Sequence, residues 1–182
     1  MNNFFNIKPE TRALIVFFTF LVIGIFVWEY FNLDWKKYLP LALFYLTIDI
    51  NTYFSIVLFT RIIPKGMIEQ DIFDIILVAL YIGLAFSLGN PLMFAFLILF
   101  IFIVATIKYA QLLNVINQPK LLKRKITIDL CGVMMGALSV GGILAGYQNY
   151  SMWLLAIVFI IVNIFLLLIW PMYVADKQDS TI

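Results

Sequence analysis

Six apolar runs, each close to the length that crosses a membrane, follow one another along this chain. A helix needs about 20 apolar residues to cross a hydrocarbon layer about 30 Å thick. The runs predict helices at residues 13–31, 40–60, 72–89, 91–110, 126–146 and 152–173. We therefore predict an all-α, six-transmembrane-helix bundle. Because the loops between the runs are short, we expect residues 1–182 to form a single transmembrane domain.

The composition agrees with a membrane protein and narrows its chemistry. Hydrophobic residues make up 64% of the chain and charged residues 12%, whereas soluble domains are about 45–50% apolar and about 25% charged. The chain has no histidine, which removes histidine-ligated haem, the common zinc sites and the Ser-His and Cys-His nucleophile pairs. We expect no metal and no cofactor. The net charge of +2 is too small to indicate nucleic acid as a partner.

The twelve lysines and arginines are unevenly distributed between the two ends of the predicted bundle. If the N-terminus is cytoplasmic, ten of them lie on the cytoplasmic side, and only Lys36 and Lys37 lie on the other. Cytoplasmic loops carry an excess of positive residues. We therefore predict that both termini are cytoplasmic, in a plasma (inner) membrane.

The most basic segment, residues 108–125, has the sequence KYAQLLNVINQPKLLKRK. We expect it to extend the fourth helix and to lie against anionic lipid. Contact with a partner protein or a nucleotide phosphate is the alternative. Besides the lipid bilayer, a second copy of the chain or another membrane subunit is the expected partner.

An aspartate at the centre of the second apolar run poses the main functional question. Asp49 is about the tenth residue of a span of about twenty, and ionisable residues at that depth usually face the bundle interior or a water-filled cavity. At about 100° per residue, Asp49 shares a helix face with Thr52 and Tyr53, and Asn51 lies on a neighbouring polar face. Asn163 lies at a similar depth in the last run. These five residues form a predicted midplane site for a cation, a proton or a polar solute, unless Asp49 only links helices through hydrogen bonds.

A second set of charged residues, Asp74, Lys108 and Asp129, lies near the predicted cytoplasmic edge. Because the third and fifth helices begin on that side, the helix dipole alone can explain both aspartates. The functional alternative is a cytoplasmic gate or exit site, with an ion pair to Lys108.

The fifth run contains Gly132 and Gly136 at the GxxxG spacing. Small residues at this spacing let two helix backbones approach closely. We predict that this face packs against the second helix or against a second copy of the chain.

Three classes of function remain open. We predict a small-solute or ion transport protein, or the membrane subunit of a transporter, because the second helix carries a buried polar site. The first alternative is a non-catalytic membrane component of a larger complex, such as an assembly, defence or signalling subunit, suggested by the glycine face and the basic segment. The second is a membrane-embedded lipid-modifying enzyme that uses Asp74 and Asp129, although we assign no catalytic residue.

Overall fold

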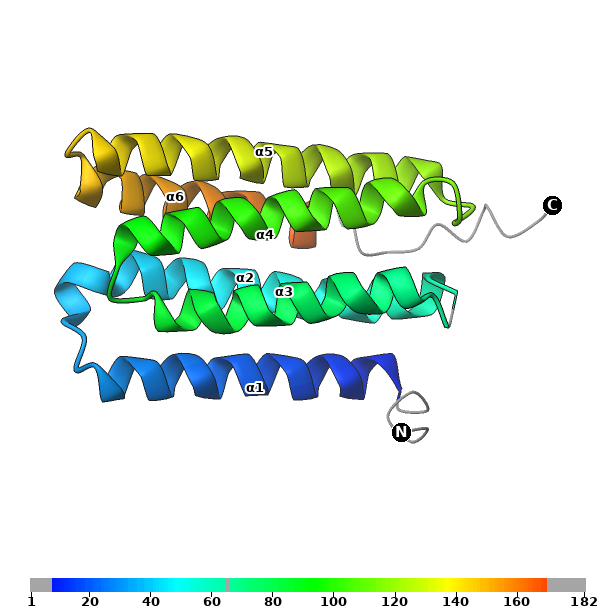
Figure 1. Cartoon of the computed structure of the whole chain (residues 1–182), viewed down its shortest axis with the longest axis horizontal. Helices are drawn as coiled ribbons and strands as arrows, with labels where there is room; N and C mark the ends of the chain where they lie inside the picture. Colours follow the sequence, from blue (N-terminus) through cyan, green and yellow to red (C-terminus); the bar gives the residue numbers. More distant parts are fainter. Residues whose placement is uncertain (1–7, 65, 170–182) are drawn as a thin grey trace.

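The computed structural model describes residues 8–64 and 66–169, and within these residues it contains helices and no strands. The helices run up and down in alternation (Figure 1). They are α1 (Pro9–Tyr30), α2 (Trp35–Ile62), α3 (Ile68–Phe86), α4 (Pro91–Leu112), α5 (Pro119–Leu144) and α6 (Gln148–Ile164), which continues into a π-helical turn, η2 (Phe165–Ile169). The predicted all-α membrane bundle is confirmed.

Five of these helices are long and apolar enough to cross a membrane: α1, α2, α4, α5, and α6 together with η2. The shorter α3 has 19 residues, and its first two turns hold Glu69, Asp71 and Asp74. The end of the sixth predicted helix, residues 170–173, lies outside the described residues.

The helices begin where the sequence supplies a proline or a capping side chain. Pro9, Pro91 and Pro119 each stand in the first turn of a helix, where the missing N–H costs nothing. The side chain of Asp34 accepts a hydrogen bond from Lys36 N at 2.9 Å, so α2 begins at Trp35, five residues before the predicted start.

The basic segment 108–125 does not continue the fourth helix, contrary to the expectation from the sequence. α4 ends at Leu112, and α5 begins at Pro119. Proline has no N–H and its ring clashes with the preceding turn, so it breaks a helix interior but fits the first turn of a new helix. The second half of the basic segment is therefore the start of α5.

The glycine face of α5 packs against α4. A Cβ added at Gly132 would stand 2.5 Å from the ring of Phe102, and one at Gly136 would stand 3.1 Å from Leu99 Cα. The sequence had suggested α2 or a second copy of the chain as the partner of this face. The close approach fixes the antiparallel register of the two helices, with residue 132 beside 102 and residue 136 beside 99.

Candidate functional site

A cavity of about 260 Å³ extends from the turn between α2 and α3 into the middle of the bundle. It lies at the end where α1, α3 and α5 begin, on the right of Figure 1, and we call this the basic end. Helices α1 to α4 each supply several lining side chains, α5 supplies Lys125 and Asp129, and α6 supplies Phe159. The polar and charged lining residues are Arg12, Asn51, Thr52, Ser55, Thr60, Gln70, Asp71, Asp74, Tyr81, Lys108, Tyr109, Lys125 and Asp129.

One face of α3 gives the length of the cavity. Gln70, Asp74, Leu77 and Tyr81 all line it, and their spacing of four, three and four residues is that of a single helix face. Gln70 and Tyr81 are eleven positions apart, which corresponds to about 16 Å along the helix axis. This length is about half the thickness of a hydrocarbon layer, which is about 30 Å.

Two lysines and a tyrosine form a charged layer midway along the cavity. The antiparallel register of α4 and α5 brings Lys125 level with Lys108 and Tyr109, and it places Asp129 one turn deeper. The Nζ atoms of Lys108 and Lys125 lie 5.9 and 5.2 Å from the centre of the Tyr109 ring. Both distances fall within the range of about 6 Å for cation–π attraction.

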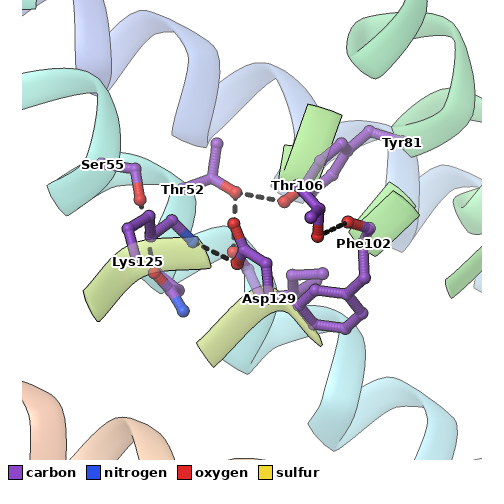
Figure 2. Close-up of polar contacts among 9 residues, drawn as sticks. Thr52, Ser55, Tyr81, Phe102, Thr106, Lys125 and Asp129 are labelled. Carbon is purple, nitrogen blue, oxygen red and sulfur yellow. Dashed lines mark hydrogen bonds and ion pairs between the residues drawn. The ribbon is translucent and has the colours of Figure 1, made fainter. Parts of the chain in front are cut away.

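Each of these lysines is paired with an aspartate. Lys125 Nζ donates to Asp129 Oδ1 at 2.6 Å, and both side chains are buried (Figure 2). Lys108 Nζ donates to Asp74 Oδ1, which joins α4 to α3. Here the lysine is buried, whereas the side chain of Asp74 is 46% exposed. The pair on α5 is therefore the more enclosed of the two.

The deep end of the cavity holds a group of neutral polar side chains. The hydroxyls of Thr52 and Tyr81 are hydrogen-bonded, and Thr52 also donates to Ile48 O at 2.8 Å. Ser55 Oγ donates to Asn51 Oδ1 at 3.4 Å. Figure 2 shows Thr52, Ser55 and Tyr81 around the Lys125–Asp129 pair.

Two polar side chains in the cavity wall are buried with atoms that have no hydrogen-bond partner among the described residues. Gln70 is 4% exposed, and neither its Nε2 nor its Oε1 has a partner. Asp129 is 0% exposed, and its Oδ2 has none. An unsatisfied buried polar group costs about 1–3 kcal/mol. Such groups in a cavity wall are positioned to bind a ligand or water.

The structure gathers residues from both sets that the sequence singled out. Asn51 and Thr52 from the midplane set and Asp74, Lys108 and Asp129 from the edge set all line this one cavity. The lining also includes Gln70, Tyr81, Tyr109 and Lys125, which the sequence analysis did not propose. Two patterns in the sequence could have indicated these lining residues. One is the helical spacing from Gln70 to Tyr81, and the other is the position of Lys125 four residues before Asp129.

Asp49 is buried away from the cavity. It is 1% exposed and does not line the cavity wall. Tyr45 and Tyr53, one turn to either side of it on the same helix face, both contact α1. Tyr45 donates to Phe20 O at 2.9 Å, and the ring of Tyr53 lies 6.5 Å from that of Phe17. Asp49 therefore faces α1, and neither of its carboxylate oxygens has a partner among the described residues.

Asn163 makes a local contact within its own helix. Its Nδ2 donates to Phe159 O at 2.8 Å, and its Oδ1 has no partner among the described residues. The structure thus shows no hydrogen bond between Asn163 and Asp49, which had been predicted to lie at the same depth.

The cavity offers a solute charges of both signs beside aromatic walls. Three lining residues are cationic, Arg12, Lys108 and Lys125, and three are acidic, Asp71, Asp74 and Asp129, so the formal charges cancel. Within the described part of the chain, no three cysteine or acidic side chains gather closely enough to hold a metal ion. The lining residues can offer a ligand hydrogen bonds, ion pairs and ring contacts.

Comparison with protein families, curated proteins and solved structures finds no match to this chain.

Proposed function

We propose that this multi-pass membrane protein is a small-solute or ion transport protein, or the solute-binding membrane subunit of a transporter. The observation that carries the proposal is a polar cavity inside a bundle of apolar helices. Charged side chains within membrane segments are costly, and they almost always face the bundle interior or a water-filled cavity. Such residues are rare, and they mark solute or ion pathways.

The volume and the walls of the cavity suit a small solute. Ligand pockets commonly enclose about 300–1,000 Å³, and the cavity of about 260 Å³ lies just below this range. Phe20, Phe59, Phe102 and Phe159 supply apolar wall, and the hydroxyl, amide and charged groups supply hydrogen bonds. Polar groups placed beside apolar and aromatic wall are typical of small-molecule sites.

The cavity occupies only the half of the bundle at the basic end. In the other half, tightly packed side chains such as Val27, Phe44, Leu84 and Phe94 fill the interior. A transport cycle would require these side chains to separate, as in alternating access. By the positive-inside rule, the basic end faces the cytoplasm. The bound solute would then exchange with that side.

Ligand-dependent stability of the purified chain in detergent tests the proposal. The assay measures Tm with a panel of amines, amino acids, organic acids, sugars and nucleosides, followed by uptake of any stabilising solute into proteoliposomes. Ser55→Phe places a ring in the cavity and should remove the response. Leu46→Phe, on an exposed face of the same helix, should retain it. A panel with neither stabilisation nor uptake in the wild type would contradict the proposal.

A further inference from the structure

The Lys125–Asp129 pair differs from an ordinary salt bridge between neighbouring turns of a helix. Exposed pairs at this spacing contribute about 0.3–0.5 kcal/mol. This pair is buried, and both residues line the cavity rather than joining two helices. Removing two charges from water costs several kcal/mol per ion, which a single contact rarely recovers. The contribution of this pair to helix stability is therefore too small to explain why the pair lies in the cavity wall.

Asp129 keeps an acceptor available in this pair. Lys125 occupies Oδ1, and the buried Oδ2 has no partner among the described residues. The same cavity wall carries the amide oxygen of Asn51 and the hydroxyls of Thr52 and Tyr81. A primary ammonium has three N–H donors, and these oxygens are acceptors for them. Aromatic rings nearby attract a cation as well.

Lys125 can leave Asp129 without leaving the cavity. Its ammonium is carried on a flexible four-carbon stem. The ammonium already lies 5.2 Å from the centre of the Tyr109 ring, which is one turn closer to the basic end than Asp129. The exposed carboxylate of Asp74 is in the same layer, beside Lys108. A displaced lysine thus has an aromatic face and solvent as alternatives.

We infer that the solute bound in this cavity carries a protonated primary amine, and that Lys125 holds the ammonium position on Asp129 until the solute displaces it. This inference rests on the proposed function, because it names the chemical class of the transported solute. The ligand is an organic amine rather than an inorganic cation. Its apolar part lies against Phe20 and Phe102, and a cavity of about 260 Å³ is far larger than a single ion.

The probe for this site is n-propylammonium, the group that Lys125→Ala removes from the lysine side chain. Thermal shift and calorimetric titration of the full chain in detergent give its apparent Kd. The wild type should bind it weakly, because the probe competes with Lys125. Lys125→Ala should bind it at least tenfold more tightly, and Asp129→Asn should lose the response. Lys123 is an exposed lysine on the same helix, and Lys123→Ala should behave like the wild type.

Four outcomes would overturn the inference. The first is equal affinity in the wild type and Lys125→Ala. The second is binding of propylammonium only in Lys125→Ala, which would show that the probe fills space created by the substitution. The third is a response that survives in Asp129→Asn, and the fourth is competition by K⁺ as strong as that by propylammonium. If Lys125→Ala does not fold, Lys125→Gln takes its place.

Matched control probes separate this inference from the proposed function. Tetramethylammonium has no N–H donor and 1-propanol has no charge, so neither should bind in the wild type. If sugars or organic acids bind and Ser55→Phe removes that binding, while propylammonium has no effect, the transport proposal stands and the amine inference fails. If no solute binds, both fail.

Discussion

The contact between α4 and α5 gives the sharpest prediction on stability, at Gly136. An added Cβ there would stand 3.1 Å from Leu99 Cα and 3.3 Å from both Leu99 Cβ and Leu99 N. Favourable carbon–carbon contacts are about 3.5–4.0 Å long. Two of these three atoms belong to the backbone, so no rotamer change can relieve the overlap. The two helices themselves must separate.

The size of the effect follows from two opposing contributions. Overpacking costs about 1–3 kcal/mol, whereas replacing glycine inside a helix gains up to about 1 kcal/mol. For Gly136→Ala we expect a net loss of about 1 kcal/mol, which lowers Tm by roughly 2–4 °C in a chain of this size. Gly136→Leu adds three more carbons against α4, and a loss of about 3 kcal/mol lowers Tm by roughly 6–12 °C.

Thermal unfolding in one detergent, with Gly141→Ala as the matched control, tests this reasoning. Gly141 lies on the same helix, and a Cβ added there meets nothing within 4 Å. Its substitution should leave Tm unchanged or raise it. Wild-type melting in Gly136→Leu, or an equal response at the two glycines, would show that the α4–α5 approach is not as close as the structure places it.

Three further predictions concern orientation, the midplane aspartate and the basic end. In a background without the native cysteine, a membrane-impermeant reagent added outside should label Asn90→Cys and not Lys123→Cys, and the reverse pattern would invert the orientation. Asp49→Asn should keep solute binding, because Asp49 does not line the cavity; lost binding at unchanged Tm would instead support the midplane site predicted from the sequence. Glu10→Gln should lower Tm only slightly, because the Glu10–Arg61 pair is about half exposed and solvent screens such a pair. A larger fall would mean that this pair holds α1 in place.

The helices were predictable because run length alone identifies a membrane helix, whatever the packing. The first residues of the helices were less predictable, because apolar runs mark the lipid layer and not the polar turns beyond it. α3 begins at Ile68 instead of 72, and α5 at Pro119 instead of 126. Gln70 lies within such a polar turn, outside the predicted span. A search confined to apolar runs therefore missed this lining residue.

The cavity could not be predicted from the sequence, because it depends on how each helix is rotated against its neighbours. Asn51 and Thr52 are adjacent in sequence, about 100° apart around α2, and both reach the cavity. Asp49 is only two positions from Asn51, yet it faces α1. The register of α4 against α5, which sets Lys125 level with Lys108 and Tyr109, follows from the contacts of Gly132 and Gly136. None of these rotations is contained in a hydropathy pattern.

The two fully buried aspartates differ chiefly in the residue one helical turn closer to the basic end. Four positions before Asp129 is Lys125, close enough to the basic end to reach both the carboxylate and Tyr109. Because α2 runs in the opposite direction, the residue one turn closer to the basic end than Asp49 is Tyr53, whose ring lies 6.5 Å from that of Phe17 on α1. The charged neighbour on α5 lines the cavity together with Asp129, whereas the aromatic neighbour on α2 packs against α1 and leaves Asp49 enclosed. The helical neighbour thus separates the two aspartates better than depth in the membrane, because depth alone had ranked Asp49 first.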